Sequence, residues 1–123
     1  MSTPTVAELL STVPTGLYIN GVWRDSASAE TFEVINPATG QTIARVADAT
    51  PADGAAALDA AVDAAAAWAA TAPRVRAETL RRAFDLLQSR ADEFALLMTI
   101  EMGKPLAEAR GEVSYGGEFL RWF

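Results

Sequence analysis

The stretch Met102–Trp122 reads MGKPLAEARGEVSYGGEFLRW and decides how the rest of this chain is interpreted. Gly103 predicts the left-handed end of one helix, because glycine adopts a positive φ without the steric penalty of a Cβ. Pro105 predicts the start of the next helix, at a position that needs no backbone donor. Glu101–Pro105 is therefore predicted to be a joint between two helices.

Apolar residues after this joint recur at helical spacing in two stripes. The stripes are Leu106, Ala109, Val113, Gly117 and Leu120, and beside them Gly111, Tyr115, Phe119 and Trp122. A helix that is apolar on two sides requires packing partners on both sides. The pattern runs on to Phe123 without a polar tail. We therefore expect this chain to be the N-terminal piece of a longer protein.

Turn residues upstream predict short antiparallel strands. Asn20-Gly21 supplies the positive φ angles of a tight hairpin, and Asn36–Gly40 combines a proline with a glycine in a second turn. The strand-like runs that flank these turns are Leu17–Ile19 with Val22–Trp23, and Thr31–Ile35 with Thr42–Val46. Together they predict a small antiparallel sheet. Residues 1–16, which mix Ser, Thr and Pro, predict a weakly ordered arm.

Helices are predicted after the strands. Thr50, Pro51 and Asp53 read as an N-cap, a first-turn proline and an acidic residue near the positive end of the helix dipole. This helix is predicted to continue to about Ala70, with an apolar side formed by Leu58, Val62, Ala65 and Trp68. Pro73 starts a second helix, which has a possible joint at Ser89–Asp92. The whole pattern is three to five short strands followed by three to four helices.

Composition excludes several classes of function. The 123 residues carry a formal net charge of −6, whereas nucleic acids and anionic membranes attract basic surfaces. Residues 1–10 lack the basic start and apolar run of a secretory signal, so we predict a cytoplasmic protein. The chain has no cysteine and no histidine, which removes the thiol nucleophile, the imidazole base and the usual zinc ligands. Taken alone, the chain is predicted to be catalytically inactive.

Three segments carry a resemblance to a known family. They are Leu17–Trp23 (LYINGVW), Val34–Gln41 (VINPATGQ) followed by Ile43 and Val46, and Glu101–Tyr115 (EMGKPLAEARGEVSY) ending in Phe119–Phe123 (FLRWF). In their order and spacing these segments resemble the aldehyde dehydrogenase superfamily, and within it most of all the succinate-semialdehyde dehydrogenase branch. The resemblance extends from about Leu17 to the last residue.

The resemblance implies an α/β fold, with residues 17–123 as an incomplete N-terminal part of the NAD(P)-binding domain. The implied full-length enzyme is a homo-oligomer that uses NAD or NADP and oxidises an aldehyde, with succinate semialdehyde expected and betaine-, lactaldehyde- or other semialdehyde-type substrates as alternatives. Members of this family need a cysteine that attacks the aldehyde, a glutamate base and a glycine-containing cofactor turn. All three lie outside this sequence, so no cofactor is expected to bind the chain alone, and its partner would be the remainder of the dehydrogenase.

Two candidate sites follow from the resemblance. Gly111, Tyr115 and Phe119 correspond to a helix that lines the aldehyde entrance tunnel, although close helix packing also explains this stripe. Val34, Ile35 and Glu101 correspond to a monovalent-cation site made of backbone oxygens and an acidic group, although a capping glutamate is the simpler interpretation of Glu101. Glu108 and Glu112, which lie one turn apart, are interpreted as a charged helix face rather than an acid–base pair, since Lys104 and Arg110 are close in sequence.

Two other hypotheses stay open at this point. One is a stand-alone helical docking or interaction module without catalysis, which would be a monomer that melts cooperatively and binds no cofactor. The other is a partner subunit completed in trans by a second chain that carries the cysteine.

Overall fold

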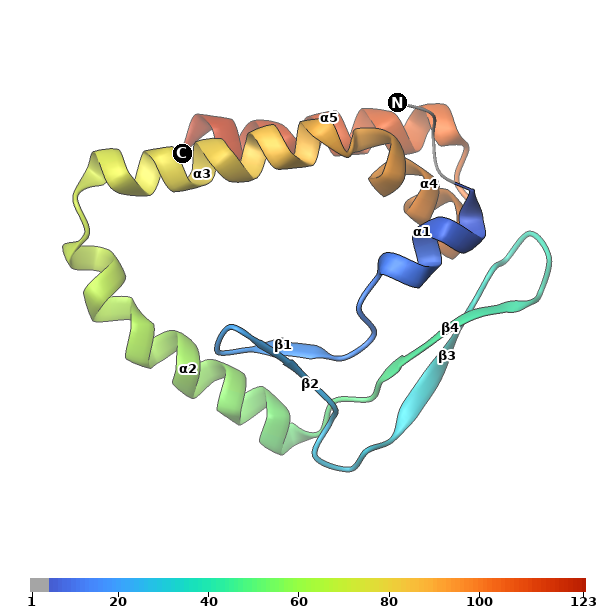
Figure 1. The fold of residues 1–123 in the computed structure, drawn as a ribbon, viewed down its shortest axis with the longest axis horizontal. Coiled ribbons are helices and arrows are strands. Elements are labelled where there is room, and N and C mark those ends of the chain that lie inside the picture. Colours follow the sequence, from blue (N-terminus) through green and yellow to red (C-terminus); the bar gives the residue numbers. More distant parts are fainter. Residues whose placement is uncertain (1–4) are drawn as a thin grey trace.

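The computed structural model describes residues 5–123. One short helix, α1, comes before the strands, and four longer helices follow them (Figure 1). The elements are α1 (Val6–Thr12), β1 (Leu17–Ile19), β2 (Val22–Arg24), β3 (Thr31–Ile35), β4 (Thr42–Ala47), α2 (Pro51–Ala70), α3 (Pro73–Ser89), α4 (Ala91–Met102) and α5 (Leu106–Trp122). The predicted order of short antiparallel strands followed by helices is confirmed.

Helix α1 differs from the weakly ordered arm predicted for residues 1–16. Residues 1–4 lie outside the described part of the chain, but Val6–Thr12 is helical. Thr5 and Glu8 form a capping box, in which the Thr5 backbone N–H donates to Glu8 Oε2 at 2.8 Å. Leu9 is buried, and α1 packs on α4. The sequence interpretation missed this helix because it depends on a tertiary contact as well as on its cap.

The strands form two separate antiparallel pairs rather than the single sheet that was predicted. The hairpin turn between β1 and β2 is confirmed, with positive φ angles at Asn20 (51°) and Gly21 (78°). Between β2 and β3 the chain turns sharply, because the buried Ser26 hydroxyl donates to the Glu30 carbonyl and Ala29 has a φ of 58°. This turn directs β3 away from β2, so β3 pairs with β4 alone.

Asp53 joins α2 to the strand region. The Thr50 hydroxyl accepts a hydrogen bond from the Asp53 backbone N–H at 3.3 Å, which confirms the predicted N-cap. The Asp53 carboxylate in turn accepts from the backbone N–H and the hydroxyl of Thr50, at 2.9 and 2.8 Å, which completes a capping box. It also accepts from the Ala27 backbone N–H at 3.1 Å and pairs with Arg24 at 3.4 Å. Only 3% of Asp53 is exposed. One buried carboxylate thus connects the start of α2, the loop after β2 and β2 itself.

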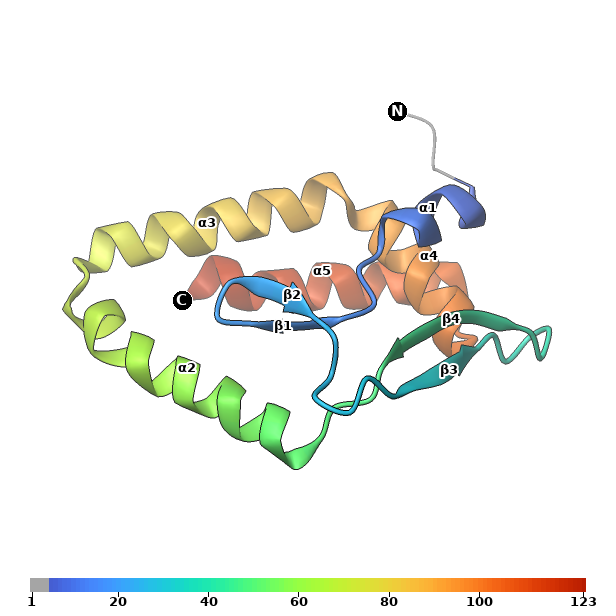
Figure 2. The ribbon, with the colours of Figure 1, turned by 60° about the horizontal axis from the view of Figure 1, so that its bottom comes forward.

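The helical core lies where α3, α4 and α5 meet. Ala95, Ala109 and Val113 are buried there, and the side chains of Leu87, Ala91, Met98 and Leu106 pack against them. In Figures 1 and 2, α3 and α5 run side by side, while α2 lies apart along another edge of an open frame. The first apolar stripe of α5 is therefore the one that faces the core.

The joint before α5 has the predicted geometry. Gly103 adopts a left-handed conformation with a φ of 80°, and its N–H donates to the Thr99 carbonyl at 2.9 Å. Pro105 precedes the first helical residue, Leu106, so α5 starts one residue later than predicted. The predicted joint between α3 and α4 is also confirmed, since Arg90 separates the two helices.

The predicted apolar side of α2 is not covered within the described residues. Leu58, Val62 and Trp68 are 64%, 63% and 47% exposed. The far end of α2 is held instead by Arg76, whose guanidinium donates to the carbonyls of Ala69 and Thr71 at 3.1 and 2.6 Å. In the part of the chain that the structure describes, no helix is both long enough and apolar enough to cross a membrane.

Replacing Gly103 with alanine should lower the free energy of unfolding by about 1–2 kcal/mol, because a Cβ is disfavoured at this positive φ. The same Cβ would lie 2.9 Å from Pro37 Cγ, which adds a steric clash between the joint and the second turn. The matched control is Gly54→Ala in α2, where a Cβ meets nothing within 4 Å. It should raise the unfolding free energy by about 0.5–1 kcal/mol. Urea unfolding followed by circular dichroism measures both changes, and equal effects would contradict this account.

The hydrogen bonds to Asp53 make the stability of the chain depend on pH. The backbone N–H of Thr50, then that of Ala27 and the Thr50 hydroxyl, hold the pKa of the Asp53 carboxyl below its ordinary value, while burial acts in the opposite direction. A group with a lowered folded pKa stabilises the fold at neutral pH, and this stabilisation is lost as the pH falls below about 4 and through the folded pKa.

We therefore expect Asp53→Asn to melt at a lower temperature than the wild type at neutral pH, and the difference to shrink toward about pH 3. Melting curves measured by circular dichroism across this range test the expectation. Asp59→Asn, on an exposed position of the same helix, is the control and should leave the pH profile unchanged. If wild type and Asp53→Asn differ in melting temperature by the same amount at neutral pH and at about pH 3, the charge of Asp53 is not the cause of the difference.

Candidate functional site

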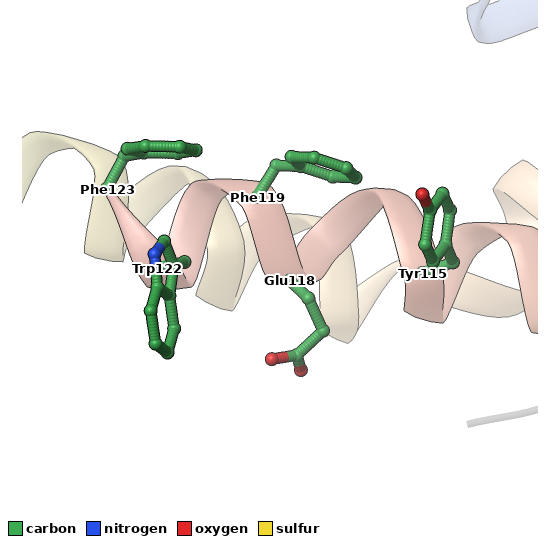
Figure 3. Close-up of a pocket in the computed structure, with 5 residues that line it drawn as sticks. All are labelled: Tyr115, Glu118, Phe119, Trp122 and Phe123. Atoms are coloured by element: carbon green, nitrogen blue, oxygen red, sulfur yellow. The ribbon is translucent and has the colours of Figure 1, made fainter.

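The exposed side of α5 carries a cluster of aromatic residues. Tyr115 and Phe119 lie one helical turn apart, with ring centroids 5.3 Å apart in an edge-to-face arrangement. They are 71% and 52% exposed. Together with Glu118, Trp122 and Phe123 they line an open hollow of about 360 Å³. Figure 3 shows the rings of Phe119 and Phe123 on one side of the helix, and Trp122 and Glu118 extending on the other.

The structure brings together two of the three residues predicted for the tunnel wall. Tyr115 and Phe119 line the hollow, whereas Gly111 lies one turn earlier on the same stripe and is not part of its lining. A Cβ at Gly111 would meet nothing within 4 Å. Gly117 differs, since its Cβ would lie 2.9 Å from the Gln88 side chain and 3.4 Å from that of Leu87. Close packing therefore explains Gly117 but not Gly111.

The sequence interpretation did not include Glu118, Trp122 and Phe123 in the site. Trp122 continues the second stripe of α5, and Phe123 follows Phe119 by four residues. Helical periodicity could therefore have predicted that the aromatic surface continues to the end of α5. An aromatic surface that is mostly exposed can exclude water from an apolar molecule, or pack against another protein element.

The predicted cation-site residues meet only in part. Val34 on β3 and Glu101 on α4 line one cavity of about 120 Å³, whose other lining residues are Leu10, Val13, Thr15, Ile43, Ala44, Val46 and Leu97. Ile35 is not in this lining, but the β3–β4 register shifts between Val34 and Ile35. Such an irregularity leaves backbone groups without their ladder partners. Among residues 5–123, no group of three or more acidic side chains gathers as a metal centre.

The charged residues at the start of α5 form ion pairs. Lys104 pairs with Glu112, and Arg110 pairs with Asp92 on α4 at 2.9 Å. Glu112 is therefore engaged with a cation, as expected for a charged helix face. These pairs connect α5 to the joint and to α4.

A sequence model described as the aldehyde dehydrogenase family matches residues 23–123. The chain belongs to this family. The resemblance inferred from the three sequence segments is thus confirmed over most of the chain.

Individual relatives agree with this assignment. The chain is 69% identical over 81 residues to a succinate-semialdehyde dehydrogenase from Paenarthrobacter nicotinovorans. These 81 residues are 66% of this chain and 18% of the relative. It is 45% identical over 105 residues to the NADP-dependent succinate-semialdehyde dehydrogenase of Escherichia coli strain K12. These residues are 85% of this chain and 22% of that protein.

The fold also matches a solved member of the family. The structure of a Staphylococcus aureus betaine aldehyde dehydrogenase in complex with NAD⁺ superimposes with a TM-score of 0.91 and 27% identity, over 95% of this chain and 24% of that one. The match therefore spans 18–24% of the length of these relatives.

The two sides of α5 should respond differently to truncation. Val113→Ala removes buried apolar atoms and should lower the free energy of unfolding by about 1–3 kcal/mol. Phe119→Ala removes an exposed ring and should change it by less than about 0.5 kcal/mol. Urea unfolding of the 123-residue chain compares the two variants. A larger loss for Phe119→Ala than for Val113→Ala would show that the aromatic side packs within the isolated chain.

Proposed function

We propose that this chain is the N-terminal part of an NAD(P)-dependent aldehyde dehydrogenase that oxidises succinate semialdehyde to succinate. The observation that carries the proposal is the 69% identity to a succinate-semialdehyde dehydrogenase, far above the 27% identity to a betaine aldehyde dehydrogenase. Betaine aldehyde and other semialdehydes are the alternative substrates. We place the enzyme in the cytoplasm as a homo-oligomer.

In this proposal the chain supports catalysis without performing it. NAD or NADP, when bound, accepts a hydride from the aldehyde carbon. The 123 residues contain no cysteine, so the thiol that attacks the aldehyde belongs to the remainder of the dehydrogenase. The sequence also lacks a glycine-rich phosphate loop between a strand and a helix, so the cofactor contacts are assigned to that remainder as well. Residues 17–123 serve as the N-terminal part of the NAD(P)-binding domain.

The chain contributes one wall of the substrate entrance. Tyr115 and Phe119 present apolar rings that remove water from the path of the aldehyde, and Gly111 leaves room beside them. Removing water strengthens the electrostatic interactions that act on the carbonyl group deeper in the enzyme. The exposure of both rings on the side of α5 away from the core supports this role.

A monovalent cation is proposed at Val34, Ile35 and Glu101. Backbone oxygens near the irregular β3–β4 register and the Glu101 carboxylate would supply hard oxygen ligands. The shared cavity of Val34 and Glu101 supports the assignment. The ion would fix β3 relative to α4 rather than take part in the reaction.

A chimera tests the proposed function directly. It replaces the matching segment of the Escherichia coli enzyme with this chain, and reduction of NAD or NADP by succinate semialdehyde is followed by absorbance. The chimera should be active and the 123-residue chain alone inactive. Phe119→Ala in the chimera should raise KM severalfold with little change in kcat, because the loss of the aromatic contact weakens substrate binding by about 1 kcal/mol.

The control variant is Glu78→Gln, on an exposed position of α3. It should leave both KM and kcat unchanged. Activity of the isolated chain would contradict the proposal, and so would a Phe119→Ala chimera whose KM equals that of the parent chimera. A chain that melts cooperatively as a monomer, together with an inactive chimera, would favour the stand-alone docking module instead.

A further inference from the structure

Lys104 is the only lysine among the 123 residues, and it lies in the joint between α4 and α5. Its ammonium group pairs with the carboxylate of Glu112, eight residues later in the second turn of α5. Only 17% of the Lys104 side chain is exposed, whereas Glu112 is 52% exposed. An ion pair between two exposed side chains contributes little, because water screens both charges. Lys104 differs, since an ammonium group that is largely withdrawn from water depends on its carboxylate partner.

Glu112 lies on the edge between the two stripes of α5. Successive residues of a helix are about 100° apart around its axis, so Glu112 is about 60° from Ala109 in one direction and about 60° from Tyr115 in the other. Ala109 is fully buried, and Tyr115 is 71% exposed. Glu112 therefore borders both the packed side and the aromatic side of the helix, and a rotation that moves its carboxylate also moves the tyrosine ring.

A second ion pair lies on the other edge of the packed side. Arg110 is on the far side of Ala109 from Glu112, and its guanidinium donates to Asp92 Oδ1 on α4 at 2.9 Å. Between α4 and α5, Ala95 and Ala109 are fully buried in the shared core. Contacts between alanines bring two helices close together but resist rotation about the helix axis less than large interlocking side chains do. Ion pairs on both edges oppose rotation of α5 in either direction.

We propose that Lys104 is a positioning residue for the substrate entrance. Its ion pair with Glu112 fixes the rotation of α5, and with it the direction of the Tyr115 and Phe119 rings. The inference rests on the proposed function, in which these rings form one wall of the entrance. A rotation of about 30° displaces a side chain at the surface of a helix by about 3 Å, because a helix with its side chains is about 10–12 Å wide. A displacement of that size removes a ring from contact with the aldehyde.

Loss of the ion pair should weaken substrate binding without slowing the reaction. The wall contacts the part of the aldehyde that does not react, so its contacts are equally strong in the bound substrate and in the transition state. Losing interactions of this kind raises KM and leaves kcat unchanged. A residue that only stabilises the fold would instead lower the amount of active enzyme and leave KM as it was.

The test uses the chimera of this chain with the Escherichia coli enzyme. Lys104→Met keeps an unbranched side chain without the charge, and it should raise the KM for succinate semialdehyde about three- to tenfold, with kcat within about twofold. Glu112→Gln, on the half-exposed partner, should raise KM as well and covers a Lys104→Met chimera that does not fold. The double variant should have a smaller effect than the product of the two single effects, because both remove one contact.

Two further variants separate the ion pair from other causes. Lys104→Arg keeps the charge and should restore KM to within about twofold of the parent chimera. Glu108→Gln is the matched control, one turn before Glu112 on the same edge of α5. Glu108 is exposed and has no ion-pair partner among residues 5–123, so KM and kcat should not change.

Four results overturn the proposal. They are an unchanged KM in both Lys104→Met and Glu112→Gln, a Glu108→Gln effect equal to that of Glu112→Gln, a Lys104→Arg chimera that behaves as Lys104→Met does, and a loss confined to kcat. The third would assign the effect to the shape of the lysine side chain rather than to its charge.

A second measurement does not depend on the proposed function. The chain has no cysteine, so Ser89→Cys on α3 and Ser114→Cys on α5, both exposed, accept two spin labels selectively. Pulsed electron paramagnetic resonance of the 123-residue chain measures the distance between the labels. Lys104→Met should shift this distance by about 2–3 Å or broaden its distribution, whereas Glu108→Gln should not.

The two measurements fail separately. An unchanged distance distribution in Lys104→Met overturns the positioning role, whatever the activity of the chimera. A shifted or broadened distribution together with an inactive parent chimera supports the control of α5 by Lys104 and contradicts the proposed function alone.

Discussion

The arrangement of this chain depends on the buried carboxylate of Asp53. It caps α2 through Thr50 and reaches across to Ala27 and Arg24, 26 and 29 residues earlier in the chain. Asp53 is the one buried residue of α2, and its carboxylate fixes the start of this 20-residue helix against β2 and the loop that follows β2. An uncharged side chain could cap the helix, but it could not also pair with Arg24.

Helices α3, α4 and α5 are held together by apolar packing rather than by a buried charge. Ala95, Ala109 and Val113 bring α4 and α5 close together, and small side chains at the contact allow this short distance. Gly117 extends the same principle to α3, since a Cβ there would meet the side chain of Gln88. The large aromatic residues of α5 are consequently directed away from the core. The packing of the fold and the aromatic surface thus have the same cause.

Function and fold are related through what remains exposed. A typical domain covers its largest apolar side chains, whereas here Leu58, Val62, Tyr115 and Trp122 are all more than half exposed. The chain belongs to the aldehyde dehydrogenase family, and its relatives are about four times as long, which agrees with apolar side chains that are left uncovered here. The 123 residues contain no cysteine, and the supporting role that we propose for the chain agrees with that composition.

The sequence by itself determined the local features of this protein. Asn20-Gly21, Thr50-Pro51 and Gly103 each specify a turn, a cap or a helix end through their own φ preferences and short-range hydrogen bonds, and the structure has all three where they were predicted. The family resemblance was also contained in the sequence, because its motifs are contiguous. The absence of cysteine, and with it the absence of a thiol nucleophile, needed no structure.

Only the tertiary structure decided which groups meet across long stretches of chain. The ion pair of Arg24 with Asp53, the separation of β2 from β3 and the burial of Leu9 against α4 all involve residues that no local pattern connects. The same holds for the cavity shared by Val34 and Glu101, and for the choice of which α5 stripe faces the core. The physical reason is that helical and strand periodicity reports which side chains share a side of an element, whereas burial depends on which other elements pack there.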